Sequence, residues 1–190
     1  MLDNLGTATT GSLSVDASIW WAVGFELDAG PDAFLDSVTL TAASDVGPSS
    51  FYRVQIFDSL AGAPGSVIAT LTSPSVDAAG DYTFTPGSAL QLSAATEYWV
   101  VSSSSDPDDL ATFSYFNRGA YTESGATFNV NGTLGSVDGG LMWGATGDNL
   151  SLQLDVTAVP EPATYGVIAA FFLFGAALLH SYRQRKRAQA

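Results

Sequence analysis

The residues of this chain that could carry acid–base or nucleophilic chemistry are almost all carboxylates. There are 19 Asp and Glu, a single histidine and no cysteine. Because His180 lies in an apolar C-terminal run, residues 1–162 contain no imidazole base, no Ser-His-Asp or Cys-His arrangement and no His-ligated zinc. They also lack lysine, which removes Schiff-base and Ser-Lys catalysis, and the chain has no G-x-x-x-x-G-K phosphate loop. Most hydrolase chemistry is therefore excluded.

Carboxylate chemistry remains, and glycoside hydrolysis is its main case. A glycosidase needs two carboxyl groups facing each other across a sugar. Glu26, Glu97 and Glu123 or various Asp could supply them, but the sequence selects no pair. Glu97, which precedes Tyr98-Trp99, fits an ordinary residue at the start of a strand. We therefore predict a non-enzymatic protein and keep a carboxylate glycosidase as the less favoured alternative.

One acidic cluster has the composition of a metal-binding loop. Asp106, Asp108 and Asp109 flank Pro107, and their oxygens could hold Ca²⁺. The cluster lacks the regular ligand spacing of an EF-hand, so we favour a solvated acidic turn. No other cofactor is predicted.

Two groups of aromatic residues could bind a ligand. Adjacent strand residues point to opposite faces, so if Trp21 faces the core then Trp20 faces outward. A second group lies beside Arg118: Tyr115, Phe116 and Tyr121. Exposed rings stack on sugar faces, which makes a carbohydrate-binding module an alternative function. The competing interpretation, which we favour, is that a loop or a partner sheet covers the rings, because large aromatics dominate sandwich cores.

The C-terminal segment combines three elements. Val159-Pro160-Glu161-Pro162 is followed by residues 163–182, which carry no ionised side chain at neutral pH if His180 is neutral. As a helix this run reaches about 30 Å, one hydrocarbon thickness. It ends in a basic cluster: Arg183, Arg185, Lys186 and Arg187. By the positive-inside rule, the sequence predicts a transmembrane helix over 163–182 and a cytoplasmic tail over 183–190.

This order of elements resembles the PEP-CTERM sorting segment of Gram-negative bacterial envelope proteins. The resemblance covers the Pro160-Glu161-Pro162 triplet, the helix that follows and the Arg-rich end. It implies that an exosortase, an integral-membrane cysteine protease, handles the segment near the triplet and transfers or releases the rest of the chain outward. The protein would be an inner-membrane-anchored precursor, and then part of the cell envelope or extracellular matrix. The alternative is an ordinary single-pass anchor with a Pro-rich hinge, since proline also suits a helix start.

The charge divides at the same point. Four of the six basic residues lie in the tail, so only Arg53 and Arg118 face all 19 acids in residues 1–162. Such a field argues against a nucleic-acid partner. It favours solubility or cation-bridged polymers such as an exopolysaccharide, although the acids can also be a simple solvated surface.

Export of residues 1–162 requires an N-terminal signal. Residues 1–7 show neither a positive region nor an apolar region. We therefore expect the true precursor to start differently, through signal removal or a misassigned first codon.

Apolar and polar residues alternate through the first 157 residues, which is typical of half-buried strands. The clearest case is Asn149–Thr157, where Leu150, Leu152, Leu154 and Val156 share one face. Similar runs predict strands at Trp20–Leu27, Val38–Thr41, Phe51–Asp58, Val67–Leu71, Tyr82–Thr85, Thr96–Ser103, Thr112–Phe116 and Thr127–Val130. Turn clusters such as Ala61–Gly65 separate them. About ten short strands predict an all-β fold, an antiparallel, jelly-roll-like β-sandwich, followed by the single C-terminal transmembrane helix.

The predicted organisation has four parts. Residues 1–157 form one extracytoplasmic β-sandwich domain, long enough for a core of its own. A linker with the Pro-Glu-Pro motif spans 158–162, and the helix and tail follow. We find no internal repeat.

A second resemblance covers residues 20–157. Phe51–Phe57 leads to Pro64-Gly65, then to Val67–Leu71, and then to Glu97-Tyr98-Trp99-Val100-Val101. This order is similar to that of choice-of-anchor domains, β-rich bacterial surface modules joined to alternative C-terminal anchors. The resemblance implies a fold and a location but no activity. The sequence thus predicts an exported, non-enzymatic surface or matrix protein with an exosortase, the membrane and an exopolysaccharide as candidate partners.

Overall fold

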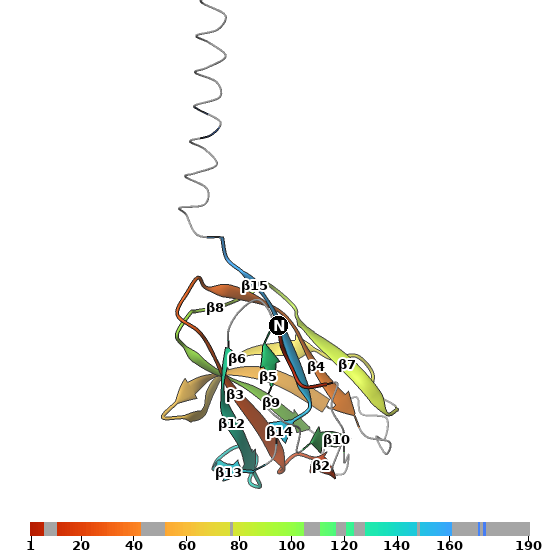
Figure 1. The fold of residues 1–190 in the computed structure, drawn as a ribbon. Coiled ribbons are helices and arrows are strands. Elements are labelled where there is room, and N and C mark those ends of the chain that lie inside the picture. The colour runs from red at the N-terminus through yellow and green to blue at the C-terminus, as the bar shows by residue number, and fades with distance from the viewer. Residues whose placement is uncertain are drawn as a thin grey trace, which may run out of the picture. The chain divides into compact units, whose positions relative to one another are not determined.

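The computed structural model describes residues 1–5, 11–42, 52–76, 78–104, 111–116, 121–123, 128–147, 149–160, 171 and 173. The chain divides into two compact units, Met1–Ala158 and Val159–Ala190. We call the first unit the body. It is all-β and its strands pair antiparallel (Figure 1).

The described residues of the body form fifteen strands. They are β1 (Leu2–Asp3), β2 (Gly11–Val15), β3 (Trp20–Leu27), β4 (Ala33–Ala42), β5 (Tyr52–Leu60), β6 (Ala63–Thr72), β7 (Gly80–Pro86), β8 (Leu90–Leu92), β9 (Glu97–Ser104), β10 (Ala111–Phe116), β11 (Thr122–Glu123), β12 (Phe128–Ser136), β13 (Gly144–Thr146), β14 (Asn149–Leu150) and β15 (Leu152–Ala158).

The main path of paired strands runs β11-β1-β15-β4-β7-β6-β5-β9-β3-β12-β13. Among the longer strands of this path, β6 and β7 are joined through two residue pairs, Leu71 with Pro86 and Thr72 with Thr85. This connection separates two halves. We call them the β4 sheet, with β1, β4, β7 and β15, and the β3 sheet, with β3, β5, β6, β9, β12 and β13.

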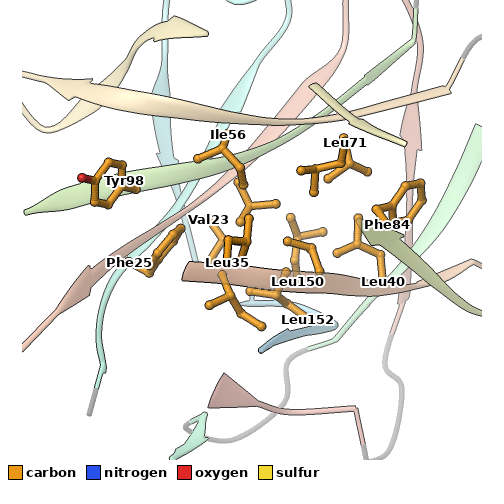
Figure 2. Packing of buried hydrophobic residues seen from close by; sticks show 14 of the residues in the cluster. Val23, Phe25, Leu35, Leu40, Ile56, Leu71, Phe84, Tyr98, Leu150 and Leu152 are labelled. Carbon is orange, nitrogen blue, oxygen red and sulfur yellow. The ribbon is translucent and has the colours of Figure 1, made fainter. Parts of the chain in front are cut away.

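The two sheets share one hydrophobic core. Val23 and Ile56 of the β3 sheet belong to the same buried cluster as Leu40, Phe84 and Leu152 of the β4 sheet (Figure 2). The fold is therefore sandwich-like, as the alternating pattern predicts. All described members of the core lie within the body.

The strands β3, β5 and β9 match the predicted bounds to within about two residues, whereas β4, β6 and β12 extend well beyond the predicted runs. In β3, the alternating residues Val23, Phe25 and Leu27 are all buried in the core. Leu150, Leu152 and Leu154 are likewise buried in it. Alternation was sufficient here because each of these strands has one face on the shared core.

The prediction of one strand over 149–157 was wrong at Ser151. There the chain changes partners: β14 pairs with β10, whereas β15 pairs with β1 and β4. Asn4 bridges the break, because its Nδ2 donates to the carbonyl of Leu150 at 2.9 Å and its Oδ1 accepts from the amide of Leu152 at 2.7 Å. A side chain near the start of the sequence thus replaces backbone pairing that the break removes.

The turn predicted over Ala61–Gly65 is shorter in the structure. Ala61 and Gly62 form it alone, with φ angles of 54° and 79°. Positive φ at both residues is what a two-residue hairpin turn needs if its twist is to match that of the flanking strands. Pro64 and Gly65 lie inside β6. Pro64 is tolerated because this half of β6 pairs with β5 only, so its missing amide faces a free edge.

Five strands were not predicted: β1, β2, β8, β11 and β13. Four of them have only two or three residues, too few to establish a period. The predicted C-terminal helix falls outside the described residues except at Phe171 and Leu173, which are helical. In the part of the chain that the structure describes, no helix is both long enough and apolar enough to cross a membrane.

Candidate binding surface

Several residues singled out from the sequence lie outside the described residues. These are Asp106, Asp108, Asp109, Glu161, Pro162, Arg183, Arg185, Lys186 and Arg187. Val159 and Pro160 are described and follow β15 directly, in no regular structure. Among the described residues, no group of three or more His, Cys, Asp or Glu is placed to hold a metal ion.

In the second aromatic group, the surroundings of the Tyr121 side chain are described. Tyr121 packs against the main core, and its hydroxyl donates to the carbonyl of Leu150 at 3.0 Å. Burial raises the pKa of this hydroxyl. Tyr115 and Phe116 lie in β10, in register with Leu150 and Asn149. For Tyr121, the structure favours the interpretation that the ring is covered by the protein over the one in which it binds a ligand.

Trp20 and Trp21 face opposite sides of the β3 sheet, as predicted. Trp21 packs against the main core, whereas Trp20 packs against a second, smaller cluster. Both rings are half-buried. Their ring nitrogens are used locally, because each donates at 3.0 Å to a backbone carbonyl, that of Ala17 for Trp20 and that of Ser14 for Trp21.

The second cluster covers the outer face of the β3 sheet, the face turned away from the main core. We call it the outer cluster. Its members are Ala22, Phe57, Trp99 and Val101, which are buried, with Trp20, Leu134 and Trp143 packed against them. Three of the four tryptophans of the chain therefore gather on this face.

Trp99 is the centre of the outer cluster and is only 1% exposed. Its ring lies against Gly24 of the neighbouring strand, where a Cβ would come within 2.8 Å of the ring atom Cη2. Its Nε1 donates to the Ser59 hydroxyl at 3.3 Å. The missing side chain at Gly24 thus creates the space that the ring fills.

Glu97 completes a polar network beside Trp99. The Ser59 hydroxyl donates to one of its carboxylate oxygens, and Nδ2 of Asn131 donates to the other at 2.6 Å. Glu26 stands opposite Glu97 on the adjacent strand. Both oxygens of Glu97 are therefore hydrogen bonded within the protein, and the carboxylate is part of the network beside the Trp99 ring.

The loop between β12 and β13 closes one end of the outer face. We call residues Val137–Trp143 the β12–β13 loop. Its backbone touches Trp20, since a Cβ at Gly140 would lie 2.7 Å from the Trp20 ring. Val137, Leu141 and Met142 point into solvent, with exposures of 81%, 84% and 73%.

Hydrogen bonds fix the shape of this loop. Oδ1 of Asp138 accepts from the amides of Leu141 and Met142 at 3.0 and 2.9 Å, and it also accepts from the Ser136 hydroxyl at 2.8 Å. These donors hold the pKa of Asp138 below its usual value, the Met142 amide most strongly. Gly139 and Gly140 supply the positive φ angles of 72° and 85° that the tight path needs.

Sequence reasoning did not single out Trp143, Leu134 or this loop. A usable signal was present, because Gly139-Gly140 marks a turn and is followed by three large apolar residues, Leu141, Met142 and Trp143. Loops are normally polar, so such a run indicates a surface with a partner or a second cluster to cover. The structure shows both features, because Trp143 packs against the outer cluster whereas Leu141 and Met142 are exposed.

No family model matches this chain, and no curated protein matches it either. A solved structure shares its fold: the crystal structure of the cysteine protease and lectin-like domains of Cwp84, a surface layer associated protein of Clostridium difficile. The match has a TM-score of 0.59 at 16% identity and covers 84% of this chain but 36% of that one. It lies in the lectin-like part of Cwp84. At this identity the likeness concerns the fold alone.

Proposed function

We propose that this chain is an exported, non-enzymatic surface or extracellular-matrix protein that an exosortase sorts through a PEP-CTERM signal. Its body would be a jelly-roll-like sandwich of the choice-of-anchor type, with a transmembrane helix behind it. The observation that supports this most is the position of the motif: β15 ends at Ala158, and the exposed Pro160 follows after a single intervening residue. The folded body therefore ends where the sorting segment begins.

The chemistry of the motif suits a protease that acts at the membrane edge. Proline lacks an amide donor and disfavours helix in the residue before it, so we expect Pro160 and Pro162 to favour an extended stretch. Glu161 between them resists entry into hydrocarbon because it is charged. A protease active site can bind a stretch that is extended and solvated.

The sorting proposal is tested by intact-mass measurement in a host that holds an exosortase. The mature protein should lack Arg183–Arg187 and be found in the envelope or the medium. Replacing Pro160, Glu161 and Pro162 with Ala should leave the uncut precursor in the membrane. A matched triple replacement at the surface segment Ser73-Pro74-Ser75 should be processed normally. A wild-type protein that retains its full C-terminus through Ala190 would overturn sorting and leave a plain membrane anchor.

The non-enzymatic assignment is supported by residue types and by the engagement of Glu97. Outside the C-terminal segment there is no histidine, lysine or cysteine to act as base or nucleophile. Both oxygens of Glu97 already accept hydrogen bonds from Ser59 and Asn131. Release of product from any polysaccharide incubated with the purified protein would contradict this part of the proposal.

Carbohydrate binding is the second candidate function, and the outer face favours it. Trp20 and Trp143 are half-exposed there, and indole faces can stack on sugar rings. The matched part of Cwp84 is described as lectin-like. The acidity of the body selects against polyanions, so the ligand would be a neutral polysaccharide.

A glycan array separates this candidate from a purely structural role. Binding to neutral glycans without turnover should fall when Trp143 is replaced with Ala. It should not change for Leu60→Ala, which removes an exposed apolar residue on the β5–β6 hairpin. Absence of binding to every neutral glycan would remove this second function.

A further inference from the structure

The β12–β13 loop presents large apolar side chains to solvent. Val137, Leu141 and Met142 are three of the most exposed large apolar residues of the body. Soluble proteins seldom expose contiguous apolar groups unless a partner covers them. All three residues lie on the loop between β12 and β13, at the end of the body that carries β13 (Figure 1).

The backbone of the loop has an unusual property: five consecutive amides are satisfied within the protein. Asp138 and Gly140 donate to the Ser136 hydroxyl oxygen, at 3.4 and 2.9 Å, and Gly139 donates to the carbonyl of Ser18 at 2.9 Å. The amides of Leu141 and Met142 donate to Asp138. Backbone donors that enter hydrocarbon must be satisfied internally, because no water is there to accept from them. This loop can leave water without losing a hydrogen bond at these positions.

The composition around the loop specifies the kind of surface. Between residues 129 and 147 the only ionisable side chain is Asp138, whose carboxylate is turned toward loop amides. No cation is present there to meet an anionic headgroup, and the rest of the body is acidic. Trp20 and Trp143 lie at the base of the loop, where indoles would reach headgroup depth if the tip entered a bilayer.

The loop lies at the end of the body opposite the end of β15. Ser136 pairs with Trp20 at one end of β3, whereas Leu27 at the other end is followed by the start of β4, where Ala33 pairs with Ala158. Figure 1 shows β13 and the end of β15 at these opposite ends. The loop and the end of β15 therefore lie at different ends of the body.

We propose that the β12–β13 loop is a lipid-contacting site that inserts Val137, Leu141 and Met142 into an uncharged or zwitterionic bilayer surface. The site is independent of the proposed sorting signal, since it lies wholly within the body. It gives the protein a second, reversible attachment to lipid. A few aliphatic side chains support weak binding, which becomes useful when other contacts hold the protein near the surface.

The chain contains no cysteine, so a single introduced one can carry an environment-sensitive fluorophore. In full-length Met142→Cys labelled with nitrobenzoxadiazole, phosphatidylcholine vesicles should shift the emission to shorter wavelength and increase its intensity. Leu60→Cys, 72% exposed in the wild type but on another hairpin, is the matched control and should not respond. Because the label reports only its own surroundings, insertion of the C-terminal segment does not produce the signal at position 142.

Three further measurements complete the test. Adding Val137→Ser and Leu141→Ser to the labelled variant should weaken vesicle binding by at least about tenfold, given the hydrophobic contribution of each side chain. These residues are exposed, so near-ultraviolet circular dichroism should confirm an unchanged fold. At low salt, the labelled protein should bind anionic phosphatidylglycerol vesicles more weakly than phosphatidylcholine vesicles, because the body is acidic. Added salt screens this repulsion and should restore binding.

Two results would overturn the lipid proposal. One is an unchanged emission at position 142 with vesicles, or an equal change at position 60. The other is a shift at position 142 that depends on protein concentration without vesicles, which would assign the loop to a contact between copies of the chain.

Discussion

The ring of Trp99 occupies the space that a side chain at Gly24 would fill, with a Cβ at Gly24 only 2.8 Å from Cη2 of the ring. The same relationship recurs on the inner face, where Gly135 lies under Trp21 on the neighbouring pair of strands. Each glycine is the cross-strand partner of the tryptophan that covers it. Two of the four tryptophans are therefore positioned by the absence of a side chain opposite them.

Gly24→Ala should destabilise the body by about 1–3 kcal/mol, the usual cost of overpacking a well-filled core. The ring is almost fully buried and has backbone beneath it, so it cannot swing into solvent without exposing the outer cluster. Urea unfolding followed by tryptophan fluorescence measures the change. Gly147→Ala is the control, because nothing lies within 4 Å of its Cβ position. Equal stability of the two variants would show that the ring has room to move.

Ser59→Ala should cost about 1–3 kcal/mol, because it leaves both the Trp99 ring nitrogen and a Glu97 oxygen without the hydroxyl that joins them. The free energy of unfolding in urea gives this directly. Ser73→Ala is a suitable comparison, since the Ser73 hydroxyl bonds only the adjacent Pro74 carbonyl on the surface. If the two serines prove equally dispensable, the network beside Trp99 contributes nothing to stability.

Asn4→Ala should be more damaging than its place near the start of the chain suggests. It removes the side-chain acceptor of the Leu152 amide and one donor to the Leu150 carbonyl, which keeps its bond from the Tyr121 hydroxyl. A buried group left unsatisfied costs about 1–3 kcal/mol. Hydrogen exchange should accelerate first at Leu152 and its neighbours. Asn129→Ala removes an amide that bonds Asp28 in an exposed position and serves as the matched control. Unchanged exchange at Leu152 would mean that the break at Ser151 is held by other contacts.

The loop carboxylate gives a prediction for low pH. The Met142 amide, followed by the Ser136 hydroxyl, lowers the pKa of Asp138 below the ordinary value of 3.8. The unfolded state then takes up a proton before the folded state does as the pH falls. The stability linked to Asp138 is therefore complete above the unfolded pKa and is lost as the pH drops through the folded pKa.

Carboxyl resonances of Asp138 followed by NMR should show titration below pH 3.8. Ser136→Ala, which removes one donor, should move the midpoint back toward the ordinary value. A midpoint at or above that value in the wild type would mean that the loop is not held by this carboxylate in solution.

Local sequence patterns predicted strands with one face on the shared core, although β4, β6 and β12 run well beyond their predicted bounds. β3 illustrates this: Val23, Phe25 and Leu27 alternate with polar or small residues, and the core determines which face is inside. The environment of Trp20 was not predictable in the same way. Alternation places it on the outer face, but a loop more than a hundred residues later decides that Gly140 and Trp143 share that face with it.

The break at Ser151 was also out of reach of local reasoning. The apolar period continues through Leu150 and Leu152, so nothing in the local pattern marks a change of partner strand. The change depends on Asn4, which lies far away in sequence and supplies the hydrogen bonds at the break. Pairwise contacts of this kind depend on topology, and a single sequence does not encode them in any periodic form.

The free half of β6 has a consequence for behaviour at high concentration. Within the described part of the chain, residues 63–70 pair with β5 alone, so one row of backbone groups faces away from the sheet, and Val67 and Ile68 beside it are 48% and 40% exposed. Such an edge can recruit strands from other molecules and seed fibrils. Pro64 interrupts the row of donors, and the two register shifts opposite Phe57 bend the strand away from a flat template. In a crowded layer of identical molecules, these irregularities would keep neighbouring copies from joining edge to edge into an insoluble sheet.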